Sequence, residues 1–170
     1  VAGQWGEVFQ ACNLPKMYMK QFQHMMPHKL EYVEHHKAHA AAGAYTSPYN
    51  SACVIVADAI GEFDTISIWD YTAPNKLKRL KTYQYPHSLG LLYSAFTQRV
   101  GLKANEEEYI LMGMAAYGEP KYAKDIEQHF FDSKDPLKLT QNVHAGIEDW
   151  MPHVPMVDEQ FKYDVAASIQ

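Results

Sequence analysis

The sequence predicts one globular domain of the α/β class, in which a mixed sheet with an antiparallel hairpin is packed by helices. Three observations predict it. The order of segments is helix, strand, helix, hairpin, strand and then further helices, which is typical of a layered α/β domain. Apolar residues alternate with period two in 65–69 but follow helical spacing in 89–100. The chain has 170 residues, of which 47% are hydrophobic and 21% charged, enough to build one core.

The first third of the chain predicts a helix, a short strand and a second helix. Residues 1–26 keep helical spacing with one interruption at Pro15, and their methionine and aromatic stripe indicates packing. Residues 30–33 favour a short strand that leads into a helix from Glu34 to about Tyr45. The alanines of this second helix favour helical structure and permit close packing.

The middle of the chain predicts a hairpin and a third strand. Residues 52–57 form an apolar run that indicates a buried strand, and residues 58–62 favour a tight turn in which Gly61 supplies a positive φ. Residues 65–69 alternate as the second strand of the hairpin. Residues 77–85 alternate apolar with basic side chains, which indicates a strand with one solvated face.

The last half of the chain is mainly helical. Ser88 is an expected N-cap for a helix that ends near Gly101, and Asn105 an expected cap for a helix that Gly118 stops. The remaining expectations are a short helix at 121–131, an irregular stretch at 132–155 with a possible strand at 137–140, and an amphipathic helix at 157–170.

Composition excludes several classes of function. A net charge of −5 argues against binding to nucleic acid through phosphate neutralisation. No apolar run approaches the ~20 residues that span a bilayer, so no membrane association is expected. The two cysteines, Cys12 and Cys53, lie far apart, whereas there are nine histidines. This balance favours a reducing, cytoplasmic compartment and a site built from histidine and carboxylate.

The histidines at 35, 36 and 39 are the strongest functional signal. His35 and His39 are four residues apart, which places both on one face of a helix. Asp58 follows the apolar strand, so a carboxylate at its end could complete a three-ligand metal site with open positions. His36 and His39 are three residues apart and could also pair, so spacing alone leaves the choice between His35 and His36 open. A zinc-protease site is excluded, because no glutamate follows the first histidine.

Two weaker candidates accompany the cluster. The turn at Gly61 and Glu62 suits an ordinary hairpin, and its alternative is a loop whose backbone N–H groups approach a phosphate or acyl group. His87, just before a helix, is a weak candidate for a general base, and its alternative is a structural cap.

Four blocks of the sequence, in order and spacing, resemble the nodulation-type O-carbamoyltransferases, a family that includes antibiotic-tailoring carbamoyltransferases of the tobramycin and cephamycin kind. The resemblance runs from about Leu30 to Pro120. The blocks are Glu34–Ala40, the strand into Asp58-x-x-Gly61-Glu62, Tyr85–Thr97 and Met112–Gly118.

The resemblance implies a fold and a reaction. The fold is part of an actin/Hsp70-like, ribonuclease-H-like domain, joined in the family to a domain that forms carbamoyladenylate from carbamoyl phosphate and ATP. The actin-like domain then passes the carbamoyl group to a hydroxyl of the acceptor. Matched onto this chain, the metal ligands are His35, His39 and Asp58, and the family adds a further aspartate much later. The ion is expected to be Fe(II), with Mn or Zn as alternatives. Gly61 and Glu62 fall at the nucleotide-side loop.

We therefore expect residues 1–170 to be one partial domain of a longer enzyme. The first strand would precede Val1, and the second half of the fold and the adenylate-forming domain would follow Gln170, so the fragment alone should be inactive. The expected acceptor is a sugar or another small hydroxyl compound, and the sequence fixes no oligomeric state. Two alternatives stay open: a sugar-kinase-like phosphotransferase, and a non-catalytic interaction module stabilised by metal.

Overall fold

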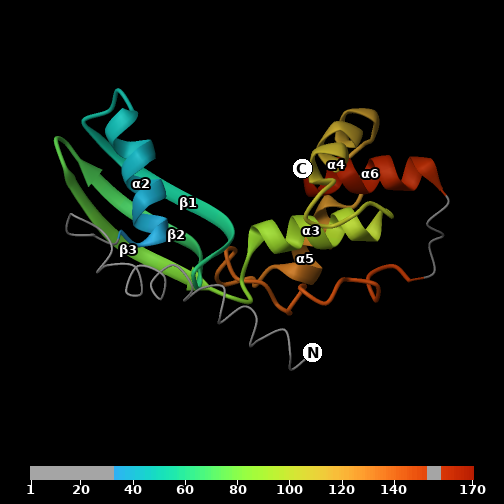
Figure 1. Ribbon diagram of the computed structural model, residues 1–170. Helices are drawn as coiled ribbons and strands as arrows, with labels where there is room; N and C mark the ends of the chain where they lie inside the picture. The colour runs from blue at the N-terminus through green and yellow to red at the C-terminus, as the bar shows by residue number, and fades with distance from the viewer. Residues whose placement is uncertain (1–32, 153–157) are drawn as a thin grey trace, which may run out of the picture. The chain divides into compact units, whose positions relative to one another are not determined.

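The computed structural model describes residues 33–152 and 158–170. The contacts of the chain divide it after Gln84 into two compact units, which we describe separately. The first unit holds one helix and a three-stranded sheet, and the second is built from helices and loops (Figure 1).

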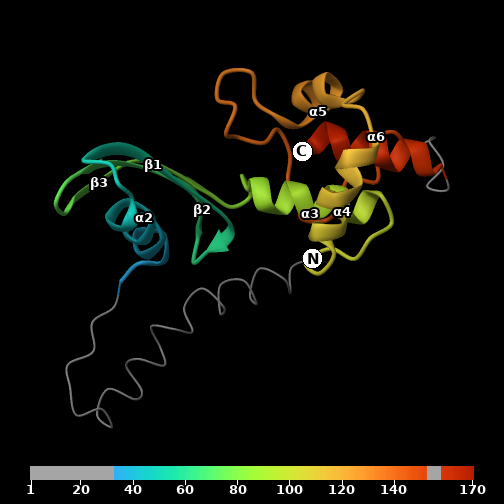
Figure 2. The ribbon, with the colours of Figure 1, turned by 90° about the horizontal axis from the view of Figure 1, so that it is seen from above.

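The first unit is an antiparallel meander with one helix against it. Its strands are β1 (Ser51–Gly61), β2 (Asp64–Thr72) and β3 (Lys76–Gln84), in the spatial order β1-β2-β3. Helix α2 (His35–Thr46) packs against β1 and β2, and two perpendicular views show it along one face of the sheet (Figures 1 and 2). The sheet therefore has one face under α2 and one face turned away from it.

The face under α2 carries a small apolar core. Ala40 of α2 packs with Val56 and Trp69, and the partly buried Val54 and Leu77 join this cluster. In the strand register Val54 lies opposite Trp69, which lies opposite Arg79 on β3. Since alternate residues of a strand share a face, the even-numbered positions of β1 point toward α2.

The hairpin is confirmed, but the tight turn predicted at residues 58–62 is wrong. Strand β1 continues to Gly61, and the positive φ, 63°, belongs to Glu62 and not to Gly61. The register shifts between Ala57 and Gly61, because β1 places residues 58–60 where β2 has only Thr65. The chain thus bends through a β-bulge before it turns, a feature that often lies beside active sites.

The strand predicted at 52–57 is confirmed by β1, but its predicted burial is wrong. Only Val56 and Gly61 are buried in β1, and Ile55 is 64% exposed. Residues 52–57 are all apolar, but α2 covers only one face of β1. The side chains along the strand are therefore alternately covered and exposed to solvent. The predicted helix at 34–45 and the third strand at 77–85 are confirmed by α2 and β3. The helix predicted at 1–26 lies outside the described residues, as does all but the last residue of the strand predicted at 30–33.

The second unit contains four α-helices and one 3₁₀ turn among the described residues. They are α3 (Leu89–Arg99), α4 (Glu108–Met114), η2 (Ala115–Tyr117), α5 (Ala123–Phe130) and α6 (Glu159–Ile169). Helix α6 packs against each of the others, so the last helix closes the unit.

An aromatic core joins the helices of the second unit. The ring of Phe96 on α3 meets Phe130 on α5 at 5.4 Å and Trp150 at 5.1 Å between centroids, both edge to face. All three side chains are at most 2% exposed. Arg99 donates hydrogen bonds to the carbonyls of Trp150 and Met151, which fixes the long loop before α6 to α3.

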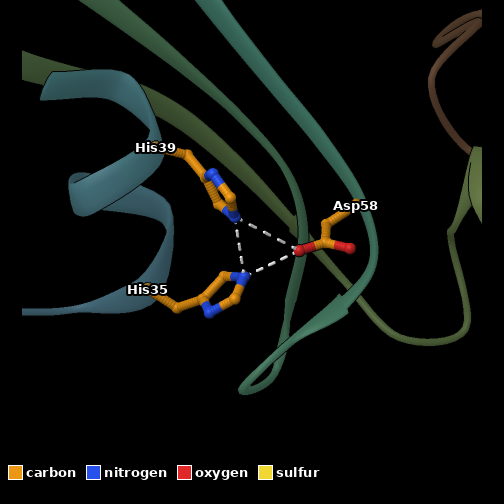
Figure 3. Close-up of side chains that lie close together, drawn as sticks. All are labelled: His35, His39 and Asp58. Atoms are coloured by element: carbon orange, nitrogen blue, oxygen red, sulfur yellow. Dashed lines mark hydrogen bonds and ion pairs between the residues drawn. The ribbon is translucent and has the colours of Figure 1, made fainter. Parts of the chain in front are cut away.

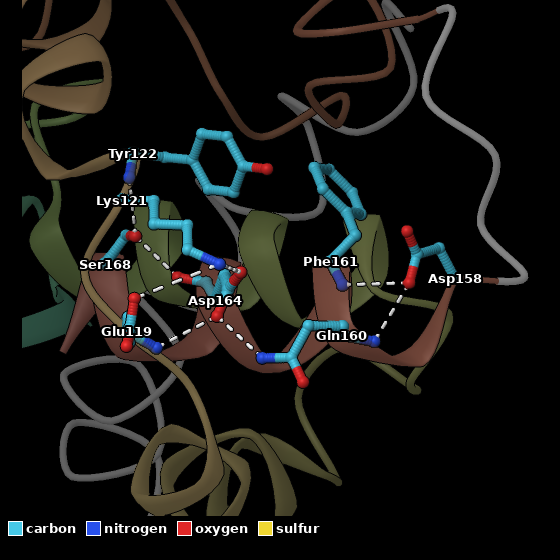
Figure 4. A network of polar contacts seen from close by, with 8 residues as sticks. All are labelled: Glu119, Lys121, Tyr122, Asp158, Gln160, Phe161, Asp164 and Ser168. Carbon is cyan, nitrogen blue, oxygen red and sulfur yellow. Dashed lines mark hydrogen bonds and ion pairs between the residues drawn. The ribbon is translucent and has the colours of Figure 1, made fainter.

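A second anchor of this unit is polar. Asp164 on α6 is buried and accepts hydrogen bonds from Lys121 Nζ at 2.6 Å, from the backbone N–H of Glu119 at 2.9 Å and from Gln160 Nε2 at 2.9 Å (Figure 4). A Cβ at Gly118 would strike the backbone of Tyr163 and Asp164, so only glycine allows this approach.

The helical predictions hold in the second unit with two corrections. Ser88 caps α3 as predicted, since its side chain accepts from the backbone N–H of Leu91. Asn105 is not the cap of α4, because the helix begins at Glu108 and Asn105 turns with a φ of 67°. The possible strand at 137–140 reduces to a single bridge between Phe131 and Leu139.

The described residues establish an α/β chain with a three-stranded antiparallel sheet packed by a helix. The parallel strand that a mixed sheet requires is not among them. The actin-like assignment and the single partial domain stay predictions. Within the described ranges, every helix is too short or too polar to cross a bilayer.

Candidate metal centre

Helix α2 and strand β1 bring together three side chains that can bind a metal ion. His35 and His39 are one turn apart on α2, and their Nε2 atoms lie 3.0 Å apart. Asp58 reaches them from β1, with its Oδ2 at 2.7 Å from His35 Nε2 and 3.7 Å from His39 Nε2 (Figure 3). One ligand atom from each residue lies within 4.8 Å of the others.

The alternation of side chains along β1 explains how a strand residue faces the helix at this point. Asp58 follows Val54 and Val56 on the face of β1 that points toward α2. Its Oδ1 accepts a hydrogen bond of 2.7 Å from the backbone N–H of Ala59. That bond fixes the carboxylate plane and leaves Oδ2 directed at the two imidazoles.

The three atoms fit one ion of transition-metal size. Metal–nitrogen bonds of about 2.0–2.1 Å place neighbouring ligand atoms roughly 2.9–3.4 Å apart around one ion. The observed separations of 2.7, 3.0 and 3.7 Å bracket that range. The side chains are 42%, 56% and 32% exposed for His35, His39 and Asp58, so an ion held there keeps open positions toward solvent.

The electrostatics of Asp58 suit a ligand. Its partial burial raises the pKa of the carboxyl, but the hydrogen bond from His35, the bond from the Ala59 N–H and the charges of both histidines outweigh burial. The pKa of Asp58 therefore lies below its usual value, and the side chain is a carboxylate at neutral pH.

The structure places His35, and not His36, beside both His39 and Asp58. His36 points into the sheet, where it is 0% exposed, and its Nδ1 hydrogen-bonds with Ser67 Oγ at 2.7 Å. Burial lowers the pKa of His36, although Asp64 and Asp58 act in the opposite direction. His36 thus lies outside the three-residue cluster, and His35 is the partner of His39.

The backbone of Gly61 lies close against the rings of His35 and His36. A Cβ at Gly61 would lie 2.6 Å from His36 Cδ2 and 2.8 Å from His36 Nε2, and it would also strike the ring of His35. The glycine is therefore needed because two imidazoles approach its backbone. The predicted role of Gly61 and Glu62 beside a nucleotide stays a prediction.

An open groove adjoins the cluster. It has a volume of about 350 Å³ and is lined by His39 and Gly43 of α2 and by residues 54–58 of β1. The groove gives a small molecule access to the faces of His39 and Asp58.

Sequence reasoning missed the residues that support the cluster. Ser67 and Trp69 lie on β2 under α2, and Arg79 lies opposite Trp69 on β3. A serine in the middle of an apolar alternating strand was the available signal, because a buried hydroxyl needs a partner.

His87 lies in the second unit, where its Nδ1 accepts a hydrogen bond of 3.2 Å from the backbone N–H of Leu139. This contact supports the alternative of a structural role. A catalytic role for His87 stays a prediction.

Curated proteins with similar sequences include the following three. The chain is 47% identical over 155 residues to the uncharacterized protein sll1178 of Synechocystis sp., a match that covers 81% of this chain and 25% of that protein. It is 28% identical over 109 residues to the nodulation protein NolNO of Sinorhizobium fredii, covering 64% of this chain and 16% of that protein. It is 32% identical over 103 residues to the uncharacterized protein MJ1058 of Methanocaldococcus jannaschii, covering 51% and 17%.

The chain therefore spans a quarter or less of the length of these relatives. The family described as carbamoyltransferase N-terminus matches residues 7–168, which include the histidine helix, the hairpin and the helices of the second unit. That match covers nearly the whole sequence, and the chain belongs to the family of carbamoyltransferase N-terminal domains.

Proposed function

We propose that this chain is the part of an O-carbamoyltransferase that binds a divalent metal ion through His35, His39 and Asp58. The observation that carries the proposal is the convergence of these three side chains, within 4.8 Å, in a chain of this family. The four-residue spacing on α2 and the side-chain alternation of β1 direct two imidazoles and one carboxylate at the same point, which supports a shared ion.

The donor set supports a choice of ion. Two imidazoles and one carboxylate suit Fe(II), Mn(II) or Zn(II), and the family resemblance favours Fe(II). A divalent ion with one carboxylate ligand keeps a net positive charge, which favours the approach of anionic groups. Bound there, the ion would polarise a carbamoyl carbonyl or hold a phosphate.

The chain's own residues have separate tasks in this proposal. Asp58 is held by Ala59 in the orientation that aims Oδ2 at the histidines. His39 and Asp58 also line the groove, so a substrate bound there would lie against the same side chains. Carbamoyl phosphate would first be hydrolysed to carbamate and phosphate, and the carbamate would displace diphosphate from ATP to give carbamoyladenylate. A hydroxyl of a sugar or another small metabolite would then attack the carbamoyl carbon, lose its proton and release AMP.

The test uses the longer protein to which this sequence belongs. Isotopically labelled carbamoyl phosphate, ATP and a panel of sugars are supplied, and transfer of label to a hydroxyl is followed by mass spectrometry. His39→Ala is expected to abolish transfer and to lower the metal content of the purified protein. His129→Ala, an exposed histidine on α5, is the matched control and should change neither.

The outcomes separate the proposal from its alternatives. Transfer that survives in a folded His39→Ala protein without metal would contradict the proposal and would support a structural role for the cluster. Phosphorylation of a sugar by ATP without carbamoyl phosphate would indicate a kinase instead.

A further inference from the structure

The cluster of three ligands depends on how α2 is rotated about its own axis. Neighbouring residues of an α-helix point about 100° apart, so the direction of one side chain fixes the direction of the next. His36 is fully buried, whereas His35 is 42% exposed in its side chain. Any contact that keeps the His36 side chain buried against the sheet therefore also fixes the directions of His35 and His39.

The apolar contacts of α2 supply little of this control. The buried residues of the helix are His36 and the alanines at 40 and 44, one turn apart. Alanine permits close approach but offers no shape that resists rotation. The N-cap residue, Glu34, makes no capping hydrogen bond with its side chain. Polar anchors must then define the first turn of the helix.

The first anchor is a buried hydroxyl. Ser67 Oγ lies 2.7 Å from His36 Nδ1 and accepts a hydrogen bond of 2.8 Å from Trp69 Nε1. An indole N–H can only donate, so the hydroxyl proton of Ser67 is available to His36. Ser67 is 0% exposed and Trp69 3% exposed, which leaves no room for water to replace either partner.

The second anchor is Arg79, which contacts both Trp69 and Glu34, the residue before His35. The guanidinium carbon of Arg79 lies 4.5 Å above the centre of the Trp69 ring. Arg79 also pairs with Glu34, the residue just before His35, and its Nη1 lies 3.3 Å from Asp64 Oδ2. Contacts thus run from Glu34 through Arg79, Trp69 and Ser67 to His36, and they begin and end on the two neighbours of His35.

We infer that His36, Ser67, Trp69 and Arg79 form a positioning device for the proposed metal centre. None of the four binds the ion in this arrangement. They hold the first turn of α2 at the rotation that makes His35 and His39 converge on Asp58. This inference rests on the proposed metal site, because a residue can position ligands only if a ligand site exists.

The test is titration of the longer protein to which this sequence belongs, purified without metal, with Co(II), whose visible absorption reports the number and kind of its ligands. The wild-type protein should bind Co(II) and give a spectrum with histidine ligands. Ser67→Ala removes the hydroxyl that joins His36 to Trp69, and it should weaken Co(II) binding by about tenfold, at the lower end of what the loss of a group that orients metal ligands costs. The shape of the spectrum should change as well.

A matched control separates positioning from stability. Thr65 is on the same strand and also 0% exposed, but its hydroxyl donates to the carbonyl of Tyr83 on β3. Thr65→Val should lower thermal stability as Ser67→Ala does, yet leave Co(II) affinity and spectrum unchanged. If Ser67→Ala does not fold, Arg79→Met serves instead. Its side chain is 31% exposed, and we expect a roughly threefold loss of affinity, smaller than that for the fully buried Ser67.

The results distinguish two kinds of failure. Failure of the wild-type longer protein to bind Co(II) through histidine would overturn the metal site and this inference together. Wild-type binding that both Ser67→Ala and Arg79→Met leave unchanged would overturn this inference and leave the metal site standing. An equal loss in Thr65→Val would show general destabilisation and would also overturn it.

Discussion

The two units of this chain hold their helices in place by different means. In the first unit, α2 sits on the sheet through two alanines and a buried histidine, with a core of a few side chains. In the second unit, α6 closes over a core of aromatic rings packed edge to face, which includes Phe96, Phe130 and Trp150. The contacts of α2 orient polar side chains, whereas the aromatic core under α6 mainly stabilises the folded state of the second unit. A site that must aim three ligands benefits more from directional hydrogen bonds than from apolar area.

The largest expected effect is on the aromatic core. Trp150→Ala removes a ring that packs on Phe96 and a hydrogen bond of 2.7 Å from its indole N–H to Asp125. We expect a loss of about 3–5 kcal/mol in unfolding free energy, as for other buried aromatic truncations. Urea unfolding followed by circular dichroism measures it. Metal binding under native conditions should persist because all three ligands belong to the first unit, and its loss would contradict this separation.

A smaller effect is expected at Asp164. Burial raises the pKa of this carboxyl, but the bonds from Lys121, the Glu119 N–H and Gln160 outweigh burial and hold the pKa below its usual value. A lowered folded pKa means that its stabilisation is complete above the unfolded value, about 3.9, and is lost as pH falls through the folded value. Asp164→Asn should therefore cost about 2 kcal/mol at pH 7.

The pH dependence gives the check on that value. Urea unfolding of the wild type and Asp164→Asn at a series of pH values from 7 down to about 2 should show the two converging below about pH 4. A difference that stays constant down to the lowest pH would mean that the carboxylate charge is not what holds α6 to residues 119–121.

At Gly61 we expect a loss of stability similar to or smaller than that of Asp164→Asn, together with a specific loss of metal binding. Gly61→Ala places a Cβ against the rings of His35 and His36, so we expect a cost of about 1–3 kcal/mol and weaker metal binding. Gly43→Ala is the control, because an added Cβ there meets nothing within 4 Å. It should stabilise α2 by about 0.5–1 kcal/mol. Equal metal affinities in the two variants would refute the close approach at Gly61.

The sequence predicted the helices and strands themselves better than the residues at which they begin and end. The alanine-rich helix and the period-two strand are local patterns, and both α2 and β2 are where the patterns put them. The end of β1 could not be predicted, because the bulge depends on how β1 pairs with Asp64 and Ile66 of β2 and not on the residues 58–60 themselves. Asn105 is a common residue type at N-caps, but hydrogen bonds between Lys103 and Glu107 form a turn there, and α4 begins only at Glu108.

The same limit applies to the site. The spacing of His35 and His39 put two candidate ligands on one helix face, and Asp58 was predicted as the third from its place after the apolar run. What spacing could not show is which of His35 and His36 turns to the sheet. That depends on Ser67, which is 31 residues away in sequence and becomes a neighbour only once the strands pair. Spatial partners of this kind are set by tertiary contacts and leave no local pattern.

The order β1-β2-β3 also has a consequence for the folding of the chain. Each described element of the first unit packs against elements that follow it closely in sequence, so short loops close before long ones are needed. Helix α6, in contrast, must close the loop of more than 40 residues between Glu119 and Asp164. Local contacts form fast and distant ones slowly. We therefore expect the histidine helix and its sheet to form during synthesis, before the last helix has left the ribosome.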